Sequence, residues 1–122
     1  MQMVSGGCGC GAVRLVASGV PDRVGLCHCL DCRKHHGAPF FAAAVFRTAE
    51  VAVTGATQSH AGRHFCAICG GSVFARSGEE VEVHLGALDQ PSLFTPTYEL
   101  WTIRRESWLA PVPGAVQFER GR

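Results

Sequence analysis

Seven cysteines in three closely spaced groups are the residues of this sequence whose types and spacing most clearly indicate chemistry. Cysteines two or three residues apart are typical zinc ligands in a reducing environment, whereas a disulfide framework favours an even count and a secreted chain. The count here is odd, and residues 1–7 show neither the basic nor the apolar stretch of a secretory signal. The sequence therefore predicts metal binding. The three groups are Cys8 and Cys10, then Cys27, Cys29 and Cys32, then Cys66 and Cys69.

The spacing within these groups suits tetrahedral zinc, which holds thiolates at about 2.3 Å and so places the sulfurs roughly 3.8 Å apart. Cys66 and Cys69 are followed by Gly70, as in a zinc knuckle, where glycine tolerates the positive φ needed after the second ligand. In a flat strand the Cα atoms of Cys8 and Cys10 would lie about 6.5 Å apart. The chain must therefore bend there, and the neighbouring glycines permit the bend.

Counting thiolates predicts two zinc ions per chain. The pairs Cys8 with Cys10 and Cys66 with Cys69 supply four thiolates, which complete a closed structural site. The remaining cysteines supply three, which leaves one coordination position for water, substrate or another side chain. We therefore expect a second, open zinc with a catalytic role. Its expected ligands are Cys27, Cys29 and Cys32.

Two other interpretations of the same residues stay open. Two cysteines of the triplet could join Cys66 and Cys69 around a single zinc, which would leave three thiols unused. Alternatively, a histidine could complete the triplet as a second structural site. His35 and His36 follow the expected turn and are candidates, whereas His28, between two ligands, is expected to point away from the metal.

Short apolar runs separated by glycine and proline predict the elements that position these cysteines. The continuous apolar run 40–46 suits a buried strand, and the alternation at 80–85 suits a half-buried one. Only 30–36 has the pattern of a short helical turn. We expect a mainly β fold of small, folded-over antiparallel sheets packed face to face, in a single domain over residues 1–122. The expected strands are 12–17, 40–46, 50–54, 72–75, 80–85 and 98–103.

Composition excludes several classes of partner. The formal net charge is +1, and the ten arginines and one lysine are scattered along the chain, so nucleic acid and acidic membranes are not expected partners. The longest apolar run is far shorter than the roughly 20 residues that span a bilayer. A hydrophobic fraction of 47% with 17% charged residues is typical of a globular protein, and we expect a cytoplasmic one.

Longer motifs surround the cysteine groups. They are Gly6-Gly7-Cys8-Gly9-Cys10-Gly11, Cys27-His28-Cys29 with Cys32-Arg33-Lys34, Gly37-Ala38-Pro39-Phe40, Phe65-Cys66-Ala67-Ile68-Cys69-Gly70, and Gly86-Ala87-Leu88-Asp89 with Trp101. Over nearly the whole chain these motifs resemble the glutathione-dependent formaldehyde-activating enzyme family, which also contains centromere protein V. The resemblance implies an all-β fold shared with a Rab-GTPase accessory protein, and two zinc ions assigned as above. It also implies an activity, the condensation of glutathione with formaldehyde, classed as a carbon–sulfur lyase reaction.

The resemblance suggests how such a reaction would proceed. The thiol of glutathione or a related small molecule would bind as thiolate at the open zinc and attack formaldehyde, with His35, His36 or a water protonating the product oxygen. Arginines would bind the carboxylates of the thiol, and the candidates are Arg33, Arg63, Arg104 and Arg105. The alternative function is a non-catalytic zinc module that binds a protein or thiol partner.

Overall fold

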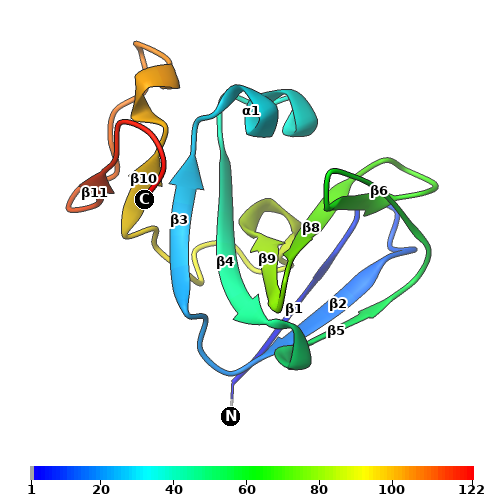
Figure 1. The fold of residues 1–122 in the computed structure, drawn as a ribbon. Coiled ribbons are helices and arrows are strands. Elements are labelled where there is room, and N and C mark those ends of the chain that lie inside the picture. Colours follow the sequence, from blue (N-terminus) through cyan, green and yellow to red (C-terminus); the bar gives the residue numbers. More distant parts are fainter. Residues whose placement is uncertain (1) are drawn as a thin grey trace.

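The computed structural model describes residues 2–122, which form short strands, one α-helix and three 3₁₀ turns (Figure 1). The strands are β1 Met3–Gly7, β2 Arg14–Ser18, β3 Arg23–Cys27, β4 Phe41–Arg47, β5 Val51–Thr54, β6 Thr57–His60, β7 Arg63–Cys66, β8 Ser72–Ser77, β9 Glu80–His84, β10 Tyr98–Leu100 and β11 Val116–Gln117. The helix is α1 Leu30–His36, and the 3₁₀ turns are η1 Thr48–Glu50, η2 Leu85–Ala87 and η3 Thr102–Arg104.

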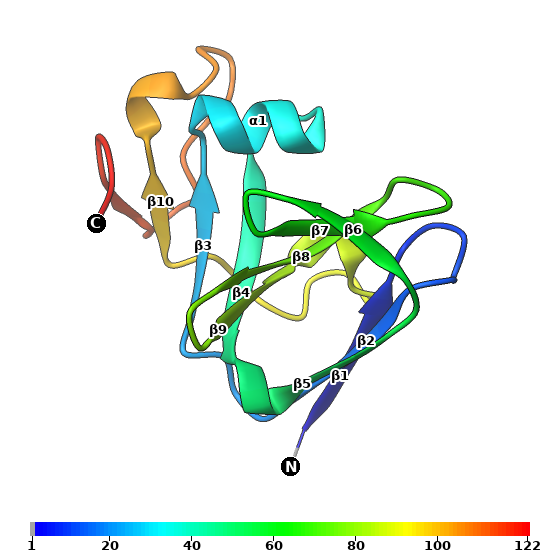
Figure 2. The ribbon, with the colours of Figure 1, turned by 45° about the vertical axis from the view of Figure 1, so that its right-hand side comes forward.

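The strands form two sheets, which confirms the expected mainly β fold. The smaller sheet has the order β1-β2-β5, and the larger has the order β11-β10-β3-β4-β9-β8-β7-β6. Figure 1 shows the smaller sheet crossing beside β8 and β9, and Figure 2 shows α1 lying across the upper ends of β3 and β4. No helix among residues 2–122 is long and apolar enough to cross a membrane.

The pairing departs from the purely antiparallel expectation at one edge. β10 runs parallel to both β3 and β11, while all other pairs are antiparallel. Parallel strands need a long connection between them. Here residues 88–97 lead from η2 to the start of β10, where the Thr97 amide donates to the Val24 carbonyl of β3 at 3.0 Å. Tertiary packing decides which strands are neighbours at the edge of a sheet. The apolar patterns of single strands therefore did not predict the parallel pairing of β10.

The two faces of the larger sheet have different roles, and alternation along β4 and β9 separates them. Ala44 and Phe46 of β4, with Val81 and Val83 of β9, are buried in the main core. Val4, Leu15 and Ala17 of the smaller sheet belong to the same core, so this face is covered by the smaller sheet. The alternate residues of β4 and β9 point to the opposite face, because successive side chains of a strand leave opposite sides.

Most of the expected elements are present. The helix at 30–36 occupies the predicted residues, and strands form within or close to all six predicted ranges. The sequence analysis missed β1, β3, β6, β7 and β11. β3 is instructive, because Arg23 and Gly25 both face the side away from the core and break the apolar pattern that would have revealed the strand.

Candidate metal centres

Four cysteines from the beginning and the middle of the chain meet at one place. The sulfurs of Cys8, Cys10, Cys66 and Cys69 all lie within 4.8 Å of one another. The Sγ–Sγ distance is 3.6 Å from Cys8 to Cys10 and 3.7 Å from Cys10 to Cys66. Tetrahedral zinc with four thiolates requires sulfurs roughly 3.8 Å apart, so the group fits this ion.

The local backbone explains why these sulfurs converge. Gly11, directly after Cys10, has φ +81°, and Gly70, directly after Cys69, has φ +77°. Both values lie in the left-handed region that glycine adopts without a Cβ penalty, as the knuckle pattern predicted for Gly70. Gly71 also allows close approach, since a Cβ there would lie 3.4 Å from both Cys69 Sγ and Cys8 Cβ.

Backbone amides donate hydrogen bonds to two of these sulfurs, those of Cys8 and Cys66. The Val13 amide donates to Cys8 Sγ at 3.2 Å, and the amides of Ile68 and Cys69 donate to Cys66 Sγ at 3.3 and 3.4 Å. The Val13 hydrogen bond is the main cause that lowers the pKa of Cys8 to about 6. Thiolate is the form that binds zinc, so this environment suits a metal ligand.

The other three cysteines meet at the junction of β3 and α1. Cys27 ends β3, Cys29 is the N-cap of α1, and Cys32 lies in its first turn, with all three sulfurs within 4.8 Å of one another. The Cys32 amide donates to Cys29 Sγ at 3.3 Å, so the cap sulfur replaces a usual capping oxygen. The helix ends at Gly37, which has φ +60° and the left-handed C-cap conformation.

The triplet is more strongly buried and less hydrogen-bonded than the four-cysteine group. Burial raises the pKa of the Cys29 thiol, and hydrogen bonding to Cys27 together with burial raises that of Cys32. Close thiolates in a dry site repel one another, and a bound cation offsets that repulsion. The group of three sulfurs therefore also fits a zinc ion, with fewer ligands than zinc requires for a closed site.

The structure assembles the cysteines in the two groups expected from the sequence, and it does not bring triplet cysteines to the knuckle. No histidine or carboxylate among the described residues joins the three sulfurs within the 4.8 Å that defines the group. The zinc ligand roles of these residues stay predictions, as does the open position at Cys27, Cys29 and Cys32.

His28 points away from the triplet, as expected, and is held by a buried carboxylate. Its Nε2 donates to Glu99 Oε1 at 2.7 Å, and both side chains are only 1% exposed. Glu99 also accepts hydrogen bonds from the Val112 amide at 2.7 Å, Gln117 Nε2 at 3.0 Å and Arg105 Nη2 at 3.1 Å. Burial opposes ionisation of Glu99, but these hydrogen bonds together outweigh it and lower its pKa to about 2. The anchor thus fixes the segment between the first two triplet cysteines.

The histidines that follow the triplet contact one another rather than the sulfurs. His35 Nε2 and His84 Nδ1 share Ser72 Oγ at 2.9 and 3.1 Å, and His36 stacks on Phe41 with ring centroids 5.0 Å apart. Burial is the main cause that lowers the pKa of His36 to about 4 and that of His84 to about 3. Both imidazoles are therefore neutral at neutral pH.

A cavity of about 410 Å³ opens beside the triplet on the face of the larger sheet that is turned away from the core. Cys27 and Cys32 line it together with His36, Phe41 and His84. The rest of its lining includes charged and aromatic residues, namely Arg23, Arg63, Arg76, Glu82, Tyr98 and Arg122. The triplet is thus accessible to a small molecule, whereas the four-cysteine group lines no part of this cavity.

Of the arginines suggested by the sequence, only Arg63 lines the cavity, and its Nη2 lies 3.9 Å from Cys32 Sγ. Arg33 instead pairs with Glu106 at 2.6 Å, Arg105 pairs with Glu99 at 3.1 Å, and Arg104 does not line the cavity. Sequence reasoning missed the cavity-lining Glu82, although the alternation of β9 marks it as opposite to the core face.

Comparison with known proteins agrees with the geometry. The family model described as glutathione-dependent formaldehyde-activating enzyme matches residues 3–104. Among solved structures, a Rhodobacter sphaeroides protein from a structural genomics series is similar, with 21% sequence identity and a TM-score of 0.55 over 93% of this chain and 98% of that one. At that identity the likeness concerns the fold alone. The comparison with curated proteins gives no match.

Proposed function

Because the chain belongs to the glutathione-dependent formaldehyde-activating enzyme family, we propose that it catalyses the addition of glutathione or a related thiol to formaldehyde. The sulfur–carbon bond forms, the carbonyl π bond breaks, and the thiol proton ends on the product oxygen, giving an S-hydroxymethyl thioether. The reverse reaction is that of a carbon–sulfur lyase. The observation that carries the proposal is that Cys27 and Cys32 open onto a cavity large enough for a small thiol.

The proposal includes two zinc ions per chain, one closed and one open. A zinc held by Cys27, Cys29 and Cys32 would supply a Lewis acid that keeps an incoming sulfur in its nucleophilic thiolate form. The chain itself supplies access through the cavity, an apolar wall that includes Phe41, and the positive charge of Arg63 beside Cys32. That charge would offset the negative charge that gathers when a further thiolate arrives.

His36 is the better candidate of the two sequence-predicted histidines for handling the proton. It lines the cavity, whereas His35 is hydrogen-bonded to Ser72. Because the pKa of His36 is lowered to about 4, it is a neutral imidazole at neutral pH. In that form it can hold a hydrogen bond to the product oxygen while water delivers the proton.

The experiment is an exchange measurement. With the zinc-loaded protein at enzyme-like concentration, NMR should show faster exchange between glutathione, formaldehyde and the adduct than in buffer alone. Cys29→Ser removes one triplet sulfur and should return the rate to that of buffer. Asp31→Asn, at an exposed position between Cys29 and Cys32, is the matched control and should retain the acceleration.

An unchanged exchange rate with the zinc-loaded wild-type protein would refute catalysis. If glutathione nevertheless bound, the chain would be a thiol-binding zinc module. Two zinc ions that both ignore small thiols would instead favour the module that binds a protein partner.

A further inference from the structure

One hydroxyl group links two histidines that belong to different elements. Ser72, the first residue of β8, has its Oγ 2.9 Å from Nε2 of His35 in α1 and 3.1 Å from Nδ1 of His84 in β9. Both distances are those of ordinary hydrogen bonds. We call His35, Ser72 and His84 the serine bridge. It runs from the half-buried side chain of His35 to that of His84, which is only 4% exposed.

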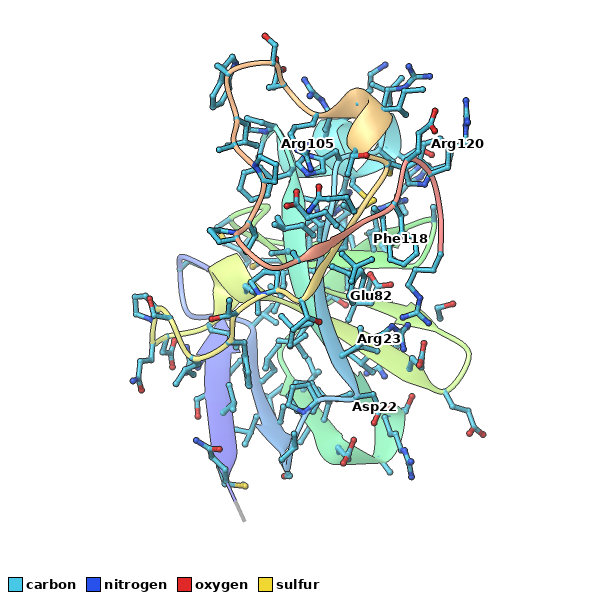
Figure 3. All side chains as sticks on the ribbon, turned by 90° about the vertical axis from the view of Figure 1, so that its left-hand side faces the viewer. Asp22, Arg23, Glu82, Arg105, Phe118 and Arg120 are labelled. Carbon is cyan, nitrogen blue, oxygen red and sulfur yellow. The ribbon has the colours of Figure 1, made fainter. Side chains whose placement is uncertain are left out.

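The inner end of the serine bridge lies at the cavity beside the triplet. His84 lines that cavity together with Cys27 and Cys32. Its Nε2 is buried and has no hydrogen-bond partner among the described residues. A buried polar nitrogen without a partner is costly, so this atom indicates a place for a molecule that exchanges hydrogen bonds with it. Figure 3 shows the same side of β9 at Glu82, which lies close to Arg23 on the side of the molecule that carries β10 and the C-terminal segment.

Small residues leave room beyond the His84 ring. The two nitrogens of an imidazole point in nearly opposite directions, so with Nδ1 turned to Ser72 on β8 the Nε2 atom points toward β4. On β4, Ala43 is paired with His84 and also with Gly25 of β3. Ala43 and Gly25 both line the cavity, and Cys27 comes two residues after Gly25 on the same side of β3. The unpartnered nitrogen therefore faces across the cavity floor toward the strand that carries Cys27.

Both histidines of the serine bridge are neutral at neutral pH, so each ring carries one proton. Burial is the main cause that lowers the pKa of His35, and burial also lowers the pKa of His84 to about 3. A serine hydroxyl has a single proton, so Ser72 donates to one ring while the other ring donates to it. When Ser72 donates to Nδ1 of His84, both rings carry their proton at Nε2. When Ser72 donates to His35, both rings carry it at Nδ1.

A concerted shift along the serine bridge converts the first arrangement into the second. His84 Nε2 gives its proton to an acceptor in the cavity, and Ser72 gives its own to His84 Nδ1. His35 Nε2 then supplies Ser72, and water supplies His35 Nδ1, which is not buried. One proton thus enters the cavity and one is taken from solvent, while every group of the bridge is neutral before and after. The reverse shift takes up a proton from the cavity and restores the first arrangement.

We propose that the serine bridge is a proton path between solvent and the cavity, and that His84 Nε2 supplies the proton taken up by the product oxygen. This inference rests on the proposed function, in which His36 holds that oxygen and water delivers the proton. The His36 ring lies 4.6 Å from the His84 ring, so the inner end of the path is beside the residue that holds the oxygen. The proton that the thiol loses passes to solvent, so the addition stays balanced. His84 is thus a catalytic residue, directly or through one water, and Ser72 and His35 are positioning residues.

The first measurement is the tautomer of each ring, read from the ¹⁵N shifts of zinc-loaded protein labelled in histidine. Because Ser72 has a single hydroxyl proton, His35 and His84 should show equal populations of the tautomer protonated at Nε2. Ser72→Ala removes the link, so the two populations should differ. Ser72→Thr is the matched variant that keeps the hydroxyl, and it should keep the populations equal.

The second measurement is the exchange between glutathione, formaldehyde and the adduct in weakly buffered solution, corrected for the rate without protein. Ser72→Ala should slow this exchange roughly tenfold or more, because a positioned proton donor contributes at least that much. Added imidazole should restore most of the lost rate, since a small acid carries protons into the cavity in place of the serine bridge. The wild-type protein should not respond to imidazole. Glutathione affinity, measured by calorimetry, should be the same in both proteins.

Ser59→Ala is the control for the substitution itself, since it makes the same change at an exposed position in β6. It should match the wild-type protein in tautomers and in exchange rate. Thermal unfolding of each variant checks that it is folded, and the tautomers of the wild-type rings test the inference without any variant.

Unequal tautomer populations in the wild-type rings would overturn the inference, as would a Ser72→Ala variant that exchanges as fast as the wild type. A loss that imidazole does not restore, or that comes with weaker glutathione binding, would show that Ser72 only supports the structure and would also overturn it. The two proposals fail separately. A wild-type protein that accelerates exchange without the tautomer match refutes the proton path alone. A protein with matched tautomers and no acceleration refutes catalysis, and with it the role of His84 in forming the product, but supports the path.

Discussion

Among the individual side chains of this protein, Glu99 has the most clearly defined structural role. It receives hydrogen bonds from four donors in a place that water barely reaches, and one of those donors is His28, between two triplet cysteines. Removing one partner of a buried charged pair leaves the other groups unsatisfied, which costs more than the pair contributes net. The segment that carries Cys27 and Cys29 therefore depends on a carboxylate from β10.

Replacement of Glu99 should destabilise the protein strongly. We expect Glu99→Ala to lower the free energy of unfolding by about 3 kcal/mol, because it leaves four donors without an acceptor. Glu106→Gln, which breaks the partly exposed pair with Arg33, should cost less than about 1 kcal/mol. Urea denaturation of the zinc-loaded proteins measures both. Similar small losses in the two variants would contradict the role given to Glu99.

The lowered pKa of Glu99 also predicts that the stability of the protein depends on pH. Its pKa in the folded protein is about 2, below the ordinary value of 4.5, so the stabilisation from its charge is fully present above about pH 4.5. It is lost as the pH falls toward 2. The difference in unfolding free energy between wild type and Glu99→Gln should therefore shrink over that interval, while zinc release, common to both proteins, cancels. A constant difference down to pH 2 would contradict this assignment.

At the scale of elements, alternation along the strands of the larger sheet separates core from cavity. Val81 and Val83 of β9 enter the core, while Glu82 and His84 line the cavity. The same principle explains Gly25 on β3, where the Tyr98 ring of β10 lies directly over the backbone. A Cβ at Gly25 would be 2.3 Å from two atoms of that ring.

A methyl group at Gly25 should therefore displace Tyr98 from the cavity wall. We expect Gly25→Ala to destabilise the protein by about 1–3 kcal/mol and to shift the ring signals of Tyr98, the single tyrosine of the chain. In a Tyr98→Ala background the same substitution should cost clearly less, because the clash is gone. Additive losses in this double-mutant cycle would show that the ring does not limit the space over β3.

Whether a strand could be predicted from the sequence depends on whether its side chains form an apolar stripe that is buried in the core. Strands with an apolar stripe, such as β4 and β9, were predictable, and the cysteine spacing indicated both sulfur groups. β3 carries Arg23 and Gly25 on its cavity face and gave no such signal. The lining of the cavity depends on the register of the strands, and its residues Arg63 and Glu82 belong to different strands, β7 and β9. The pattern of a single sequence does not show which residues face one another on neighbouring strands. Only the three-dimensional structure therefore brings these residues together.

At the scale of the whole molecule, the four-cysteine group joins distant parts of a small chain. Cys8 and Cys10 follow β1 of the smaller sheet. Cys66 ends β7 of the larger sheet, and Cys69 lies in the turn between β7 and β8. A zinc there closes a loop of some 60 residues, and zinc binding in small domains contributes on the order of 10 kcal/mol to folding. The triplet, by contrast, spans only six residues, from Cys27 to Cys32.

The two groups should therefore respond differently to loss of a sulfur. Cys29→Ser should lower the zinc content from two to about one per chain and leave a cooperative thermal transition. Cys66→Ser, in the four-cysteine group, should abolish that transition or lower its midpoint by at least about 10 °C. Metal analysis and calorimetry on purified protein measure both quantities. A folded Cys66→Ser variant as stable as Cys29→Ser would show that the closed group does not hold the fold together.

The donors around Glu99 also bear on where this domain can be cut. The family match stops at residue 104, yet Arg105, Val112 and Gln117 all lie beyond it. An expression fragment that ends at residue 104 would keep every cysteine. It would still remove three of the four groups that donate hydrogen bonds to Glu99. The region that matches the family and the minimal folding unit therefore have different borders in this protein, because residues 105–122 supply contacts that hold Glu99 in place.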